Sequence, residues 1–207
     1  AILPNCCFAF VLLFIHFLFL SISQLRAQYN FSFCLIIPLH CHLQLSFLDS
    51  FFAGRSGIFL SGKRFSVGFH ESGIGLLASS VSLMKMFVQE TPSLIIQVGI
   101  AGCFEKKIPL GKVFVVKDDF AGDIGVVENK QWKDLFDLKL DKPNDAPYEK
   151  KSLPNPWINQ YNLLKLPSKK GVTVNTITTK KNKIELFSKR YKASLESMEG
   201  AALHYIG

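Results

Sequence analysis

Hydrophobic and polar positions follow two different patterns along the 207-residue chain. Residues 1–48 are dominated by Phe, Leu and Ile, carry Arg26 as their one fixed charge and contain no Asp or Glu. From residue 68 onward, short apolar runs alternate with glycine turns and charged segments, which is typical of an α/β protein. We therefore expect two segments, an atypical apolar head at residues 1–48 and a domain at residues 49–207.

Three interpretations of the head remain open. Residues 6–22 form an apolar run of nearly the length that spans a bilayer, and they could also be the core of a signal peptide. The Phe and Leu runs could instead form a buried pair of strands. We favour a third interpretation, a non-native beginning such as a gene fragment or a misread frame, because the head disagrees with the rest of the chain.

The domain contains strands and helices in alternation. The helix expected at residues 76–89 carries Leu77, Val81, Met84 and Val88 at helical spacing, so we expect that face to be buried. Further helices are expected at residues 181–191 and from about residue 199. The expected strands cover residues 65–69, 94–98, 112–116, 171–175 and 193–195.

Two polar stretches are interpreted as surface. Asp118, Asp119 and Asp123 fall on a glycine-containing segment that we expect to be an exposed loop or a subunit contact. Residues 129–157, rich in Lys, Asp, Asn and Pro, predict a long surface excursion with little regular structure.

Two motifs could carry chemistry. Gly99-Ile-Ala-Gly102 follows an expected buried strand, where small residues let a ligand approach the backbone. Glu196-Ser-Met-Glu-Gly-Ala-Ala202 places Glu199 where a strand gives way to a helix, and a carboxylate there can accept hydrogen bonds from two sugar hydroxyls.

The order and distance of these motifs resemble the nucleoside phosphorylase superfamily over about residues 68–207. Gly-Ile-Ala-Gly-Cys-Phe together with Glu-Ser-Met-Glu-Gly-Ala-Ala looks most like the futalosine hydrolases, with methylthioadenosine/S-adenosylhomocysteine nucleosidases as near relatives. The resemblance implies an α/β three-layer sandwich with a mixed central sheet, incomplete at both ends. It also implies a nucleosidase of menaquinone biosynthesis; a phosphorylase or a non-catalytic nucleoside-binding remnant are the alternatives.

The resemblance also implies roles for individual residues. Met198 would lie under the ribose, and Glu199 would hold its 2′- and 3′-hydroxyls. The other implied contacts are Ala101 and Gly102 beside the base and ribose, Ile177 and Thr178 against the base, and Glu71, Ser72 and Gly73 near the sugar.

The residues of the glycine turn bear on whether water or phosphate is the nucleophile. Related phosphorylases offer a Ser or Thr hydroxyl there to phosphate, whereas this chain has Ile100 and Ala101, so the turn favours hydrolysis. By the resemblance, the general acid would follow Gly207 and the water-activating Glu would lie in the head, which contains no carboxylate. We therefore expect little or no turnover from the chain as given.

Charge and cysteines change this interpretation little. The net charge is +8, but Lys residues are interspersed with Asp and Glu, so we expect no nucleic-acid partner. We expect no metal or cofactor, and the group Cys34, His40, Cys41 and His42 lacks paired metal-ligand spacing. The expected partner is a nucleoside, and the complete protein is expected to be a cytoplasmic, dimer-based homo-oligomer. Export or membrane anchoring through the apolar head is the alternative.

Overall fold

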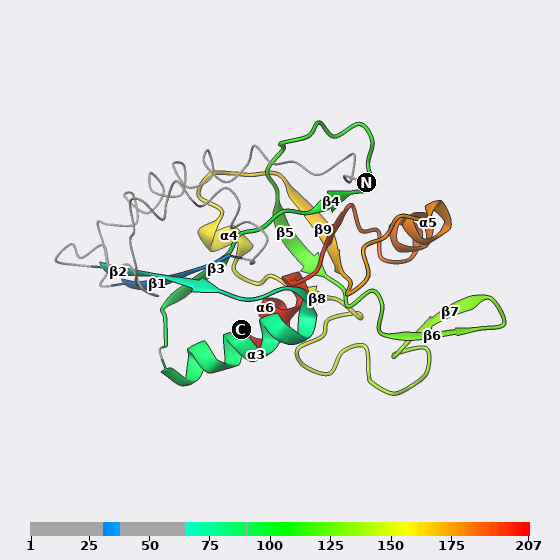
Figure 1. Ribbon diagram of the computed structural model, residues 1–207, viewed down its shortest axis with the longest axis horizontal. Helices are drawn as coiled ribbons and strands as arrows, with labels where there is room; N and C mark the ends of the chain where they lie inside the picture. The colour runs from blue at the N-terminus through cyan, green and yellow to red at the C-terminus, as the bar shows by residue number, and fades with distance from the viewer. Residues whose placement is uncertain (1–30, 38–64, 90) are drawn as a thin grey trace. The chain divides into compact units, whose positions relative to one another are not determined.

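The computed structural model describes residues 31–37, 65–89 and 91–207 (Figure 1). The chain divides into two compact units after Ile100. The expectations for residues 6–22 and for the His40, Cys41 and His42 group lie outside the described residues. Within the described ranges, no helix combines the length and the apolar character needed to cross a membrane.

The first unit holds a parallel three-stranded sheet. Its strands are β1 (Phe31–Ile37), β2 (Phe65–Glu71) and β3 (Leu94–Gln97), in the order β2-β1-β3. The helix α3 (Gly75–Gln89) follows β2 after a turn in which Gly73 and Gly75 have positive φ, a conformation that glycine adopts without steric cost. The strands expected at residues 65–69 and 94–98 and the helix expected at 76–89 are therefore confirmed, with shifts of one or two residues at their ends.

The predicted buried face of α3 is wrong. Leu77 and Val88 are 78% and 83% exposed, and Val81 and Met84 are also exposed. At 100° per residue, the buried residues Gly75, Ser79, Leu83 and Met86 lie on the opposite side of the helix. Because apolar residues surround much of this helix, spacing alone did not select the face, and the small residues Gly75 and Ser79 mark the buried side instead.

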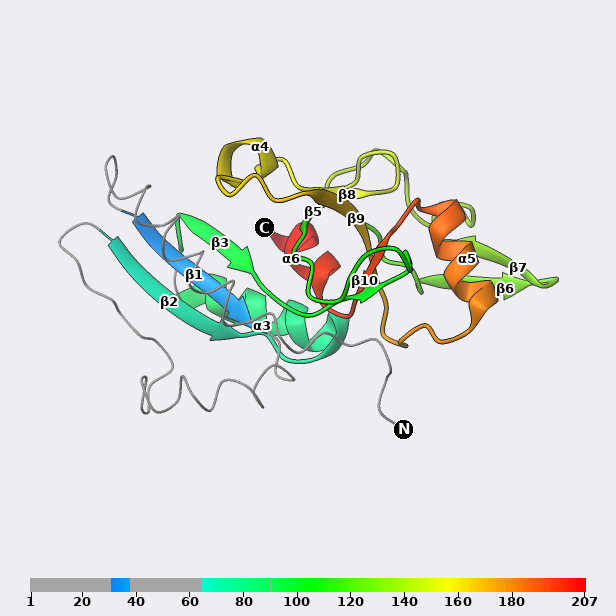
Figure 2. The same ribbon diagram turned by 90° about the horizontal axis from the view of Figure 1, so that it is seen from above.

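The second unit is built on a mixed five-stranded sheet (Figure 2). Its central strands β10 (Leu195–Ser197), β9 (Ser168–Thr173) and β5 (Val115–Asp119) are parallel. The edge strands β4 (Gly102–Cys103) and β8 (Leu153–Pro154) are antiparallel to their neighbours β10 and β5. Because successive side chains of a strand point to opposite faces of a sheet, β9 contributes side chains to both faces of this one.

Helices cover both faces of the second sheet. On one face, Val172 joins a buried cluster with Phe187 of α5 (Lys181–Arg190). On the other face, the hydroxyl of Thr173 accepts a hydrogen bond from the N–H of Ala201 in α6 (Gly200–Ile206) at 2.8 Å. A short helix, α4 (Ile158–Tyr161), precedes β9. Helix, mixed sheet and helix form the three layers that the sequence predicts.

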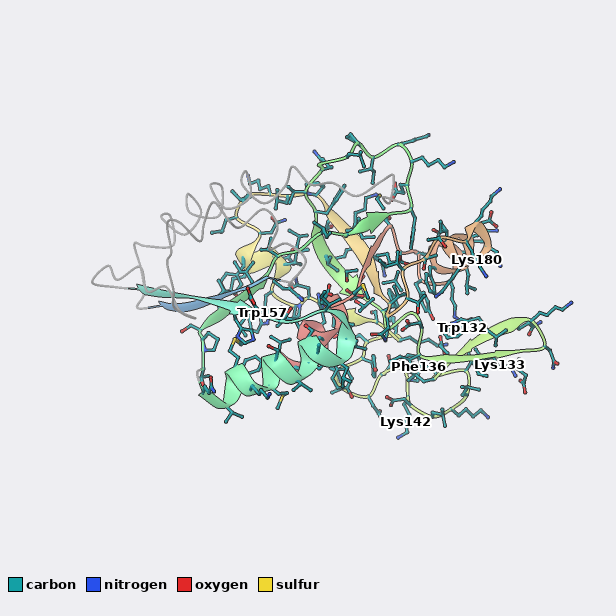
Figure 3. The ribbon with its side chains drawn as sticks, viewed as in Figure 1. Trp132, Lys133, Phe136, Lys142, Trp157 and Lys180 are labelled. Atoms are coloured by element: carbon teal, nitrogen blue, oxygen red, sulfur yellow. The ribbon has the colours of Figure 1, made fainter. Side chains whose placement is uncertain are left out.

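The excursion at residues 129–157 is more ordered than predicted. It begins in a hairpin of β6 (Gly125–Glu128) and β7 (Gln131–Asp134), whose turn residues Asn129 and Lys130 have positive φ. The Trp132 side chain reaches from β7 to the end of α5, where its Nε1 donates a hydrogen bond to the Tyr191 hydroxyl at 3.2 Å (Figure 3). Further along, Tyr148 and Leu153 are buried, so much of this segment belongs to the folded unit.

Candidate functional site

The strand-to-helix junction after β10 presents a nearly buried carboxylate. β10 ends at Ser197 and α6 begins at Gly200, which leaves Met198 and Glu199 between them. Glu199 is the N-cap residue of α6 and is only 3% exposed, while Met198 is half-buried. The junction position predicted for Glu199 is therefore confirmed, whereas its contact with a ribose stays a prediction.

A hydroxyl relay supports the start of α6. The N–H of Gly200 donates to Ser197 Oγ at 3.1 Å, and Ser197 Oγ lies 3.3 Å from Thr173 Oγ1. Thr173 Oγ1 in turn donates to Asp119 Oδ1 at 3.1 Å. The first backbone N–H groups of a helix have no partner within the helix, so side chains of β9 and β10 satisfy them here.

Asp119 is the last residue of this relay. The prediction that it lies on an exposed loop is wrong. It ends β5 and is 1% exposed. Burial raises the pKa of the Asp119 carboxyl to about 7, against the opposing effect of hydrogen bonds from the Phe120 N–H, at 2.7 Å, and from Thr173. A Cβ at Gly171 or Gly200 would crowd Asp119 Oδ2, so these glycines make room for the carboxyl group. Asp118 lies in the same strand, and only Asp123 lies in the loop that follows β5.

Glu196 is a second buried carboxylate at the same junction, and the sequence motifs did not point to it. It is 7% exposed, and its Oε1 accepts a hydrogen bond from the Thr178 N–H at 2.8 Å. Glu196 also pairs with Gly102 across the β10–β4 ladder. A charged residue directly after the strand expected at residues 193–195 is the signal that could have identified it.

Six of the predicted ligand-contacting residues belong to the second unit. Gly102 and Thr178 meet at Glu196, and Met198 with Glu199 follows directly along the chain. Ala101 precedes Gly102 and is exposed, as is Ile177 at 47%. These six positions are thus all in the second unit and next to β10 or the loop after β9.

The predicted residues near the sugar, Glu71, Ser72 and Gly73, belong to the first unit. There Ser72 is fully buried and its hydroxyl donates to the Gly73 carbonyl at 3.3 Å. Their placement near a sugar stays a prediction.

Among the residues that the structure describes, no three His, Cys, Asp or Glu side chains converge in a way that could hold a metal ion.

Comparison with known proteins gives a structural likeness but no sequence match. No family model matches the chain, and no curated protein matches it. The futalosine hydrolase of Helicobacter pylori superposes with a TM-score of 0.62 at 16% identity, over 84% of this chain and 80% of that one. The fold is that of the nucleosidases.

Two other nucleosidases give the same result. The 5′-methylthioadenosine/S-adenosyl homocysteine nucleosidase of Campylobacter jejuni has a TM-score of 0.64 at 14% identity, over 84% of this chain and 78% of that one. The S-adenosylhomocysteine nucleosidase of Streptococcus pyogenes has a TM-score of 0.61 at 15% identity, over 86% and 78%. The expected phosphorylase/nucleosidase fold class is confirmed, and at these identities the likeness concerns the nucleosidase fold alone.

Proposed function

We propose that this chain is a nucleosidase that hydrolyses the N-glycosidic bond of a purine-type nucleoside, with futalosine as the preferred substrate. The observation that carries the proposal is the nearly buried Glu199 between β10 and α6 of a nucleosidase fold. A carboxylate there can accept hydrogen bonds from two neighbouring sugar hydroxyls. Such contacts hold the ribose and stabilise positive charge that develops on it as the bond to the base breaks.

The remaining contacts follow from the positions around β10. Ala101 and Gly102 would present backbone to the nucleoside, Met198 would lie under the ribose, and Ile177 and Thr178 would lie against the base. Ala101 and Gly102 are exposed, and half-buried Met198 adjoins Glu199 in the chain. Neither the acid that protonates the base nor the group that activates water is assigned to a described residue.

Water is preferred over phosphate as the nucleophile. Ile100 and Ala101 of the glycine turn carry no hydroxyl that could donate to a phosphate oxygen. Burying a charged oxygen without a donor costs about 1–3 kcal/mol, which would weigh against phosphate at this turn. Phosphorolysis is therefore the second candidate, and a phosphate dependence would favour it.

The test measures cleavage and binding with the same protein. Futalosine, methylthioadenosine and inosine are each incubated with the full-length protein, with and without phosphate. Released base is measured by chromatography, and calorimetry gives the dissociation constant. We expect phosphate-independent cleavage, fastest with futalosine. Glu199→Gln should weaken binding or kcat/KM by about 10- to 100-fold, because one hydrogen bond to a charged group is worth about 1.5–3 kcal/mol.

A matched control uses another glutamate outside the site. Glu185→Gln changes an exposed residue of α5, whose ion pairs with Lys181 and Lys189 are 3.9 and 3.8 Å long, and should leave both measurements unchanged. Cleavage only with phosphate would move the assignment to a phosphorylase. Neither binding nor cleavage of any of the three nucleosides would refute the proposal.

We also propose that the complete protein is a cytoplasmic, dimer-based homo-oligomer. Support comes from α3, whose residues Leu77, Val81, Met84 and Val88 form an exposed apolar stripe. An apolar stripe of this kind is a common feature of protein interfaces.

A further inference from the structure

We propose that Glu196 is a positioning residue that fixes the loop between β9 and α5, residues 174–180, in the shape that receives the base of the nucleoside. The inference rests on the proposed function, because that function places Ile177 and Thr178 of this loop against the base. Glu196 would act through the loop and through Gly102, without itself reacting.

The contact with the loop is direct. Glu196 Oε1 accepts a hydrogen bond from the Thr178 backbone N–H at 2.8 Å. A bond from an N–H to an ionised carboxylate is stronger than one between neutral groups. Because the acceptor belongs to a sheet strand and the donor to a connecting loop, the bond ties the middle of the loop to the sheet.

The position of Glu196 in the sheet adds a second link. In the β10–β4 ladder Glu196 is paired with Gly102, and a Cβ built on Gly102 would lie 3.9 Å from the Glu196 Cβ. In the parallel β10–β9 ladder Glu196 is paired with Val172, so its side chain lies on the sheet face that α5 covers. Glu196 therefore joins two predicted ligand-contacting segments, the glycine turn and the 174–180 loop.

The hydrogen bonding of Glu196 argues against a purely stabilising role. Its second oxygen, Oε2, is buried and has no hydrogen-bond partner among the residues that the structure describes, and the same is true of Thr178 Oγ1. A buried carboxylate that is only half satisfied weakens a fold relative to an apolar side chain of similar size. Stability alone is therefore a poor reason for a carboxylate at this position, whereas holding the loop N–H requires an acceptor.

The test separates positioning from stability with two variants. Glu196→Leu removes the acceptor, and Glu196→Gln keeps an oxygen that can accept from the Thr178 N–H. We expect Glu196→Leu to raise the KM or the dissociation constant of the preferred nucleoside by about 10-fold, the value of one such hydrogen bond, with kcat changed far less. Hydrogen exchange of the amides at residues 176–180 should become faster, the melting temperature should stay level or rise, and Glu196→Gln should restore most of the affinity.

Each other outcome has a definite meaning. Wild-type protein that binds nucleoside, with an affinity unchanged in Glu196→Leu, overturns the inference and leaves the proposed function standing. A lower melting temperature in both variants with parallel losses in kcat and affinity also overturns it, because a structural role would produce that result. Wild-type protein that binds no nucleoside refutes the proposed function, and the positioning role in base binding falls with it.

Discussion

Replacing Asp119 by asparagine should flatten the pH dependence of the stability of the fold. Asp119 is fully buried, and burial raises the pKa of its carboxyl from 3.8 to about 7. Below pH 3.8 both the folded and the unfolded chain hold this proton. Between pH 3.8 and 7 the unfolded chain releases it while the folded chain keeps it, so the free energy of unfolding falls as the pH rises.

The magnitude follows from that interval. At 1.36 kcal/mol for each pH unit, the interval from 3.8 to about 7 corresponds to a loss of about 4 kcal/mol, complete above pH 7. An asparagine in place of Asp119 would not titrate, and its side-chain oxygen could still accept from the Phe120 N–H and the Thr173 hydroxyl. Any change in those bonds would shift the stability of the variant by the same amount at every pH.

Urea unfolding at pH 4, 6 and 8 measures this effect. The stability of Asp119→Asn relative to wild type should rise by about 4 kcal/mol from pH 4 to pH 8. Asp118→Asn is the control, because Asp118 is the preceding residue of β5 but is partly exposed and paired with Lys170 at 2.9 Å. The reasoning is refuted if the difference between Asp119→Asn and wild type stays constant across this range.

Two further substitutions test the packing of α6 and the exposed face of α3. Gly200→Ala should lower the free energy of unfolding by about 1–3 kcal/mol, because its Cβ would collide with Asp119 Oδ2. Gly102→Ala should change the urea midpoint little, because within the described part of the chain the atoms nearest to its Cβ lie at 3.9 Å. Val88→Lys should shift the protein toward monomer in analytical ultracentrifugation if the apolar stripe of α3 is a subunit contact. A monomeric wild-type protein, or an unchanged dimer in the variant, would contradict that assignment.

The order of strands and helices could be predicted because glycine and proline mark their ends. Thr91-Pro92 follows α3, Gly73 precedes it and Gly75 is its first residue. The mainly apolar run at residues 94–98 that predicts β3 contains the observed strand Leu94–Gln97. The junction of Glu199 was predictable for the same reason, since Gly200 follows it directly and Gly200-Ala-Ala begins α6. These signals lie in the local sequence, so they can be interpreted without the tertiary structure.

Features that depend on distant partners were not predictable. The burial of Asp119 needs Gly171, Thr173 and Gly200, which lie more than fifty residues away in the chain.

The hairpin β6–β7 is a local feature, and it was missed because its turn uses Asn129-Lys130 at positive φ where Asn-Gly would have been recognised.

The two-residue connection between β10 and α6 limits how this region can vary. Along β10, Glu196 points to the face of the sheet that bears α5, and Ser197 points to the face that bears α6. Inserting or deleting one residue within β10 would exchange the two, removing the acceptor from Thr178 and the hydroxyl from the start of α6. Substitutions at this junction can therefore adjust the site one contact at a time, whereas a change in length would dismantle both sides of it together.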